Sequence, residues 1–270
     1  MPSSRSASPI SRSSDSGAVA RPVTGEVGLA HAAGSLAIKL ALAPLLVVQA
    51  IRTRRRAPVL PEAAGAREGR AGAGEGSVFR VLVAGDSSAA GVGVAHQDRA
   101  VVGHFVRTLE RHRAGPIAWR LSAKSGLTTR GVHALLAADP PPAVDVAVVI
   151  SGVNDVVDQI PARRAVAHRA ALADWLLERG LARHVVFAPL PPMHQFPLLP
   201  EPLRRVLGAD ARRHDAALAR WAATRGDVSH ATIELELSVE TMASDGFHPG
   251  EPVYRACGEA LALHVAQRKL

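Results

Sequence analysis

Short apolar runs alternate with longer stretches of helical periodicity along the chain from residue 79 onward. The apolar runs of strand length lie at residues 80–84, 118–123, 144–151, 185–190 and 232–237. Helical spacing of apolar residues follows each run, at residues 101–113, 129–137, 162–179, 203–225 and 253–268. The run at 144–151 is apolar almost throughout, which is typical of a parallel strand covered on both faces. A strand followed by a helix, five times over, predicts a three-layer α/β/α sandwich with about five parallel strands.

The first 76 residues show a different pattern. Residues 1–28 are rich in Ser, Pro, Gly, Ala and Arg and are expected to be disordered. Residues 57–76 contain Pro and several Gly, and are expected to be a linker. Between them, residues 29–56 join an Ala/Leu/Val-rich stretch to four closely spaced arginines, namely Arg52, Arg54, Arg55 and Arg56. The compact domain is then expected at residues 77–270.

Residues 29–56 are predicted to attach a cytoplasmic protein to the inner face of a membrane. Arginines beside an apolar stretch tend to stay on the cytoplasmic side, where they attract anionic lipid. Lys39 and Pro44 interrupt the stretch, so an interfacial helix and a helix packed on the compact domain are alternatives. A signal peptide ending near Ile51 is another, although arginines directly after it would resist export.

The net charge of +8 is spread unevenly along the chain. Residues 1–76 carry 10 Lys and Arg against 5 Asp and Glu, and the remainder carries 22 against 19. No nucleic-acid partner is expected, because such proteins usually concentrate basic residues on the fold and stack bases on aromatic residues, which make up only 3% here. No metal or other cofactor is expected either, because the histidines show no HExxH-like spacing and Cys257 is the single cysteine.

Three short motifs follow the first three predicted strands. Gly85-Asp86-Ser87-Ser88 places a serine between small residues, where a substrate carbonyl could approach it. Gly126, in the second motif, could present its backbone N–H to a ligand, and Asn154, in the third, could donate its side-chain N–H without adding charge. Taken one at a time, each motif is also typical of an ordinary turn. The carboxyl ends of parallel strands meet at one edge of the sheet, which is where a site is expected.

A fourth motif, Asp245-Gly-Phe-His248, precedes the last predicted helix. Spacing of i and i+3 on a turn can hold the Asp carboxylate against Nδ1 of the His and leave Nε2 free to accept a proton. A surface Asp and a helix-capping His would give the same spacing.

Together, the four motifs resemble those of the SGNH hydrolase superfamily, which includes the GDSL esterases and lipases. The resemblance covers about residues 77–270 and implies a flavodoxin-like α/β/α fold. It assigns Ser87 as nucleophile, Asp245 and His248 as acid and base, and Ser87, Gly126 and Asn154 as the oxyanion hole. The chain departs from the common Gly-Asp-Ser-Leu in having Ser88 as its fourth residue. Asp86 and Asp155, beside these positions, are interpreted as hydrogen-bond acceptors that stabilise loops.

The resemblance implies a serine esterase or lipase that hydrolyses carboxylic esters, with a small ester or an acyl lipid as substrate. An acyltransferase or carbohydrate deacetylase would use the same residues with a different acceptor or substrate. An inactive, membrane-associated binding protein on the same fold is the alternative from another class. The apolar, proline-rich segment 189–200 is predicted to be either a wall that holds an acyl chain or a rigid connector.

Overall fold

The computed structural model describes residues 26–268, with side chains from residue 40 onward. The chain divides into two compact units, Met1–Pro44 and Leu45–Leu270. Helix α1 (Glu26–Arg56) contains Pro44 and supplies residues to both units. Most of the predicted disordered segment, residues 1–28, lies outside the described residues.

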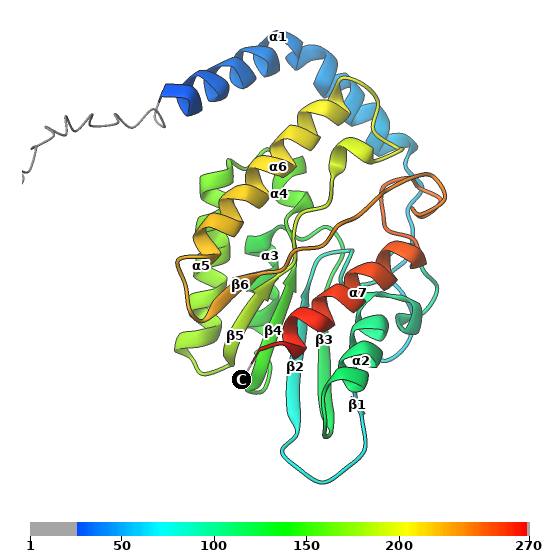
Figure 1. Ribbon diagram of the computed structural model, residues 1–270. Coiled ribbons are helices and arrows are strands. Elements are labelled where there is room, and N and C mark those ends of the chain that lie inside the picture. The colour runs from blue at the N-terminus through cyan, green and yellow to red at the C-terminus, as the bar shows by residue number, and fades with distance from the viewer. Residues whose placement is uncertain (1–25, 269–270) are drawn as a thin grey trace, which may run out of the picture. The chain divides into compact units, whose positions relative to one another are not determined.

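The second unit contains a mixed sheet of six strands in the order β1-β3-β2-β4-β5-β6 (Figure 1). The strands are β1 (Glu68–Ala71), β2 (Phe79–Gly85), β3 (Ile117–Ala123), β4 (Val144–Ile150), β5 (Ala182–Phe187) and β6 (Val228–His230). Every neighbouring pair is parallel except β1 and β3. Strand β2 is central, with β3 on one side and β4 on the other. The predicted sandwich is therefore confirmed, with an antiparallel edge strand added.

Helices connect the strands and cover both faces of the sheet. They are α2 (Val101–His112), α3 (Thr129–Ala138), α4 (Val153–Val157), α5 (Ala162–Glu178), α6 (Leu203–Ala222) and α7 (Glu251–Ala266). Their starts have local causes: the Thr128 side chain accepts a hydrogen bond from Gly131 N and caps α3, and Pro252 occupies the first turn of α7, where no backbone donor is needed. Two short 3₁₀ helices, Gln97–Arg99 and Met193–Gln195, lie in the connections.

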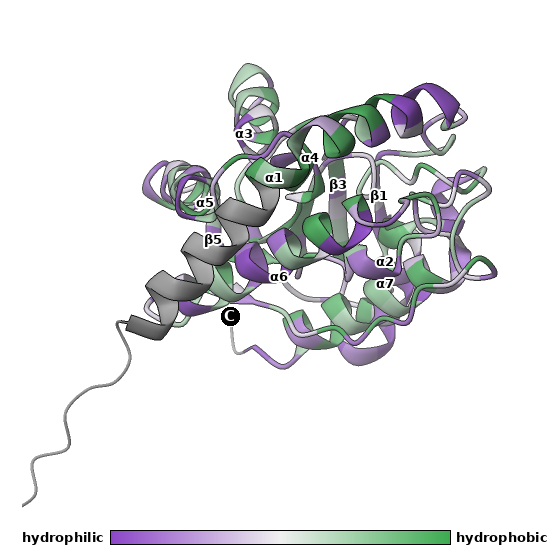
Figure 2. Cartoon of the chain, turned by 90° about the horizontal axis from the view of Figure 1, so that it is seen from above, coloured by the Kyte–Doolittle hydropathy of each residue, from purple (hydrophilic) through white to green (hydrophobic). Residues whose placement is uncertain are grey.

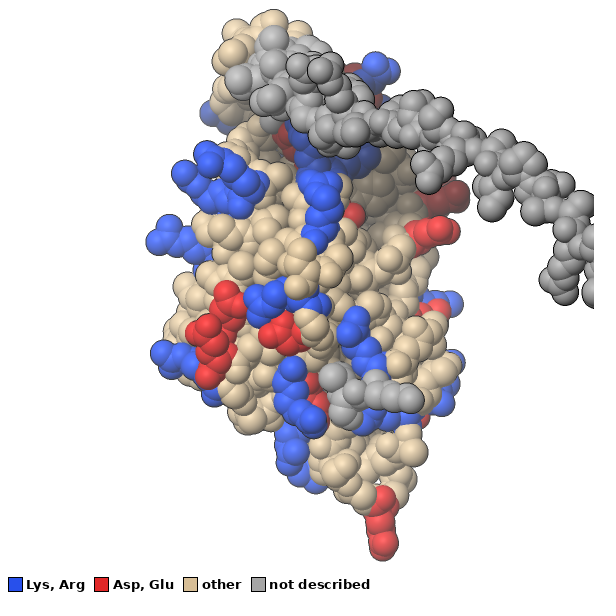
Figure 3. Space-filling model, turned by 60° about the vertical axis from the view of Figure 1, so that its left-hand side comes forward, with Lys and Arg blue, Asp and Glu red and all other residues tan. Residues whose placement is uncertain are grey.

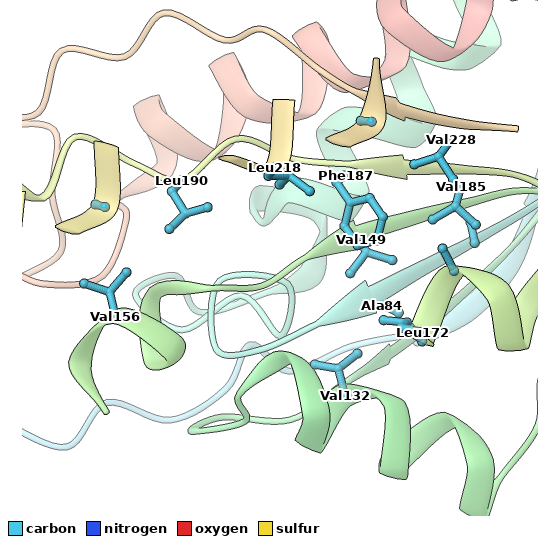
Figure 4. Packing of buried hydrophobic residues seen from close by; sticks show 14 of the residues in the cluster. Ala84, Val132, Val149, Val156, Leu172, Val185, Phe187, Leu190, Leu218 and Val228 are labelled. Atoms are coloured by element: carbon cyan, nitrogen blue, oxygen red, sulfur yellow. The ribbon is translucent and has the colours of Figure 1, made fainter. Parts of the chain in front are cut away.

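Alternation along the strands sends successive side chains to opposite faces. Residues such as Leu82, Val149 and Phe187 pack with α3, α5 and α6 on one face, and Figure 4 shows part of this cluster. Residues such as Val83 and Val148 pack with α2 and α7 on the other. Hydrophobic residues accordingly dominate the strands in the interior, whereas hydrophilic ones lie mainly on the outer faces of the helices (Figure 2).

The prediction of a fifth strand at residues 232–237 is wrong. Residues 232–237 form no strand, and the sixth strand is the three-residue β6 just before them. The alternation that suggested a strand is nevertheless present, because Ile233, Leu235 and Leu237 are partly or fully buried and the residues between them are exposed. The segment is thus extended like a strand, but its apolar side chains face a cavity and its backbone pairs with no other strand.

The predicted linker also needs correction. Residues 57–76 contribute strand β1 to the sheet and bury Ala63 in the second unit. Strand β1 pairs with β3 along four residues, from Glu68 opposite Arg120 to Ala71 opposite Ile117. The sequence of β1, Glu-Gly-Arg-Ala, has no apolar run because three of its four residues are exposed at the sheet edge.

The described helices include none that is both long and apolar enough to cross a membrane. Within the second unit, the end of α1 packs on the rest: Leu46 contacts the core, and the Gln49 side chain donates to the Glu201 carbonyl at 2.7 Å and accepts from Leu203 N at 3.2 Å. This packing matches one alternative raised above for residues 29–56. Attachment of this segment to a membrane stays a prediction.

Candidate active site

The sheet register brings three of the sequence motifs to one edge. Gly85, the last residue of β2, pairs with Ala123 of β3 and with Ile150 of β4. Ser87, Gly126 and Asn154 follow these three positions within two to four residues, so all three lie at the carboxyl ends of adjacent parallel strands. The loop after β3 is held there because Lys124 N donates to the Gly85 carbonyl at 3.2 Å.

Glycine is required at position 85 for this close approach. A Cβ atom there would lie 2.1 Å from the Ile150 carbonyl oxygen. Asp86 N donates to the same oxygen at 3.1 Å, which extends the pairing of β2 with β4 by one residue. The turn that carries Ser87 therefore begins directly at the sheet, without a flexible spacer.

Ser87, His248 and Asp245 form one hydrogen-bonded chain. Nε2 of His248 lies 3.0 Å from Oγ of Ser87, and Nδ1 of His248 lies 2.5 Å from Oδ2 of Asp245. The other Asp245 oxygen accepts from the backbone N–H groups of Phe247 and His248, both at 2.9 Å. The Asp-x-x-His turn thus orients its own carboxylate, and the carboxylate orients the imidazole toward Ser87.

Asp245 is buried, with 4% of its surface exposed. Burial alone would raise the pKa of its carboxyl, but the hydrogen bonds from the His248 imidazole and from the backbone N–H groups of Phe247 and His248 outweigh it, so the pKa lies below its ordinary value. The carboxylate is consequently charged at neutral pH and can stabilise a positive charge on the imidazole.

Candidate oxyanion donors meet on the side of Ser87 next to β3 and β4. The half-buried Asn154 uses one side-chain N–H to donate to the Leu127 carbonyl at 2.9 Å, which leaves its second N–H for another acceptor. Gly126 is exposed, has a φ of +81°, and has no atom within 4 Å of the place where a side chain would begin. The backbone N–H of Ser88 is not available, because it donates to Asp86 at 3.0 Å.

Asp86 lies beneath the turn that carries Ser87, with 2% of its surface exposed. Burial raises the pKa of its carboxyl from 3.8 to about 6, although hydrogen bonds from the backbone N–H groups of Ser88 and Gly152 act in the opposite direction. Asp86 therefore ties the turn of Ser87 to the loop that precedes Asn154. This agrees with its interpretation as a loop-stabilising acceptor.

A buried ion pair supports the loop of Asn154 from below. Asp155 and Arg169 are both fully buried, and Oδ2 of Asp155 lies 3.6 Å from an Arg169 guanidinium nitrogen. Asp155 also accepts from the backbone N–H of Thr129 at 3.2 Å and from its hydroxyl at 2.5 Å. Arg169 donates to the Ser151 carbonyl at 3.3 Å. The guanidinium fills the space beside Gly152, where a Cβ would lie 2.1 Å from it.

Arg169 was not singled out from the sequence. The available signal is its place on α5, since Ala165, Arg169, Leu172 and Leu176 share the buried stripe of that helix. A charged residue on an apolar stripe indicates a buried partner. Burial lowers the pKa of Arg169, while the charges of Asp155, Asp215 and Asp86 act against this effect.

An apolar cavity of about 720 Å³, a volume that includes its open mouth, adjoins Ser87 and His248. Its walls come from the predicted apolar loop (Pro189, Pro191 and Phe196), from the extended segment after β6 and from α7. The loop and the segment are joined, because Leu237 N donates to Oε1 of Gln195 at 2.9 Å. Three residues of the loop thus line this cavity, and that the wall holds an acyl chain stays a prediction. The contribution of α7 was missed.

The chain matches the GDSL-like Lipase/Acylhydrolase family over residues 83–256. No curated protein matches it in sequence. Among solved structures, a member of the lipolytic protein G-D-S-L family from Veillonella parvula has a TM-score of 0.52 at 14% identity, covering 72% of this chain and 100% of that one. An aryl esterase from M. smegmatis has a TM-score of 0.51 at 20% identity, with coverages of 69% and 98%.

A carbohydrate acetylesterase from Sinorhizobium meliloti has a TM-score of 0.50 at 16% identity, with coverages of 70% and 98%. These likenesses are of fold, because the identities are low. The family match spans more than half of the chain and includes Ser87, Gly126, Asn154, Asp245 and His248. The chain accordingly belongs to the GDSL-like lipase/acylhydrolase family of ester-hydrolysing enzymes.

Proposed function

We propose that the protein is a serine esterase or lipase that hydrolyses a small ester or an acyl lipid through an acyl-enzyme. One observation carries the proposal: the hydrogen-bonded chain of Ser87, His248 and Asp245 adjoins an apolar cavity. A nucleophile, a base and an oriented carboxylate are the parts that acyl transfer to a serine requires. The two neighbours named above as esterases agree with this class but do not identify the substrate.

In the acylation step, Oγ of Ser87 attacks the ester carbonyl carbon while Nε2 of His248 takes the hydroxyl proton. A bond forms between Oγ and the carbonyl carbon, and the bond from that carbon to the alkoxy oxygen then breaks. His248 gives the proton to the departing alcohol. Water attacks the acyl-enzyme by the reverse route and releases the acid. Asp245 stabilises the charged imidazole in both steps.

The developing oxyanion is held by the backbone N–H of Ser87, the backbone N–H of Gly126 and the free side-chain N–H of Asn154. These groups follow the ends of three neighbouring strands by two to four residues, which supports a site whose donors are positioned before the substrate binds. Donors fixed in advance stabilise a transition state without reorganising during the reaction.

The test combines labelling with turnover on the purified full chain. A fluorophosphonate probe is expected to label Ser87 in the wild type and to leave the folded Ser87→Ala protein unlabelled. The same substitution should reduce hydrolysis of p-nitrophenyl esters by roughly 10⁴–10⁶-fold. A Ser88→Ala variant is the matched control, because Ser88 is the neighbouring hydroxyl. Labelling that persists in Ser87→Ala would reject Ser87 as the nucleophile.

A further inference from the structure

The cavity beside Ser87 follows one face of helix α7. Its lining includes Val253, Tyr254, Cys257 and Leu261, which are spaced so that they share a single face of the helix. From Val253 to Leu261 the helix rises by about 12 Å at 1.5 Å per residue. The cavity therefore extends from the Ser87–His248 pair toward the third turn of α7.

The opposite wall is the extended connection between β6 and α7, drawn in orange in Figure 1. Its inward residues Ile233, Leu235 and Leu237 line the cavity, whereas Thr232, Glu234 and Glu236 are exposed. Period-two alternation is what an amphipathic wall requires, because one side meets solvent and the other meets the ligand. The alternation in this segment is therefore explained by the cavity.

The interior of the cavity offers few groups for a polar ligand. The Tyr254 hydroxyl donates to the Val92 carbonyl at 2.6 Å, so it is already used. Burial raises the pKa of the Cys257 thiol to about 12, which keeps it neutral. The other polar lining groups, Ser87, Ser88 and His248, lie at the end where the reaction takes place. A sugar or a charged group would lose its hydrogen bonds to water in such a place.

We propose that this cavity binds an acyl chain longer than acetyl, running along α7, and that Cys257 limits its length. The proposal rests on the serine esterase function proposed above. The apolar cavity suits the acyl part of the ester, because the acyl group stays bonded to Ser87 through both half-reactions. Before deacylation the alcohol has to leave and water has to enter. The part of the site that holds the alcohol therefore requires access to solvent.

The experiment measures kcat/KM for p-nitrophenyl esters whose acyl chains increase from two carbons upward. Each methylene that enters the cavity is expected to raise kcat/KM by roughly 4-fold, until the chain reaches the side chain of Cys257. Cys257→Trp is expected to shift the optimum to shorter chains. It should lower the ratio of kcat/KM at the wild-type optimum to that for acetate by roughly 60-fold, the loss of three methylenes.

Two substitutions serve as matched controls. Leu263→Trp introduces the same side chain on α7 at a position that is 39% exposed and does not line the cavity, so the acyl profile should not change. Cys257→Ala removes bulk from the lining position and should move the optimum to longer chains, whereas an unchanged optimum would reject Cys257 as the limit. Should Cys257→Trp fail to fold, Ile233→Trp applies the same test from the opposite wall.

A profile that is flat in acyl length would overturn the proposal, and so would equal losses at all lengths in a folded Cys257→Trp protein. Dependence on the length of the alcohol in a series of acetate esters, with none on the acyl chain, would assign the cavity to the leaving group and also overturn it. In each of these cases Ser87 would still react with a fluorophosphonate. Failure of that labelling would instead reject the proposed function itself.

Discussion

The two sides of Ser87 are built on opposite principles. On the side of β3 and β4, polar groups are buried and interlocked: Asp155 accepts from Thr129, pairs with Arg169 and lies beneath the loop of Asn154. On the side of α7, the lining is almost entirely apolar, and the Tyr254 hydroxyl is used in a hydrogen bond to the Val92 carbonyl. A hydrogen-bond donor has to occupy one position, whereas an apolar wall has to provide only volume and shape.

The buried network differs equally from the charges on the surface. Lys and Arg side chains are spread over the face in Figure 3 with acidic side chains between them. Arg225, for example, lies 2.8 Å from both Asp174 and Asp227, which is shorter than the 3.6 Å between Arg169 and Asp155. Distance alone would rank the surface pairs higher, but solvent screens them and the buried pair is not screened.

The largest expected effect comes from breaking the buried pair. Arg169→Met should lower the free energy of unfolding by roughly 3–5 kcal/mol, because Asp155 keeps a buried charge without its partner. Arg225→Met, the surface control, should cost less than about 1 kcal/mol. Urea unfolding at neutral pH measures both. Equal costs for the two substitutions would contradict the distinction between buried and surface pairs.

The next largest effect concerns Asn154, on the side of β3 and β4, and distinguishes binding of the transition state from binding of the substrate. Asn154→Ala should lower kcat by roughly 10²–10³-fold with little change in KM, because the oxyanion forms only during the reaction. Steady-state kinetics with the ester of the best acyl length gives both constants. A variant with normal kcat would mean that Asn154 serves only to hold the loop through the Leu127 carbonyl.

Sequence reasoning recovered the parts of this site that are local. The Gly-Asp-Ser turn, the Asn154 loop and the Asp-x-x-His turn each lie within a few residues, and the order of strands along the chain predicts that they meet. Four of the five predicted strands and all five predicted helices are present in the structure, shifted at their ends by one to three residues. These elements have strong periodic patterns, which local sequence preserves.

The remaining parts depend on contacts between distant segments. Arg169 lies 14 positions after Asp155 and belongs to no motif, so only the packing of α5 on the rest of the fold brings it to that carboxylate. Residues 232–237 have the alternation of a strand, yet their buried side chains face a cavity. A sequence pattern cannot distinguish side chains that line a cavity from side chains that pack beneath a sheet. Strand β1 lacks any apolar pattern because it is an exposed edge that pairs along its backbone.

A smaller effect concerns Asp86 and depends on pH. Its pKa of about 6 is above the ordinary value of 3.8, so between these values the folded protein binds more protons than the unfolded chain. The free energy of unfolding should therefore fall as pH rises from about 4 to about 6, by roughly 3 kcal/mol from this group, and stay lower above. Asp86→Asn should remove this component. Parallel stability curves for wild type and variant, measured by urea unfolding across this range, would contradict the assignment.

The smallest effect tests the hydrogen bond of Tyr254 on the apolar side. Burial raises the pKa of Tyr254, so its hydroxyl stays protonated and donates to the Val92 carbonyl, and Val92 N in turn donates to the Ser87 carbonyl at 3.0 Å. Tyr254→Phe removes this link but keeps the ring in the cavity wall. It should lower the free energy of unfolding by about 1–2 kcal/mol and leave the acyl-length profile unchanged.

Tyr254→Leu removes the ring as well, so its acyl-length profile should change because the wall has a different shape. If the Phe variant altered acyl preference as much as the Leu variant, the hydroxyl would be acting on the substrate, and the α7 side would not be the purely apolar surface described above.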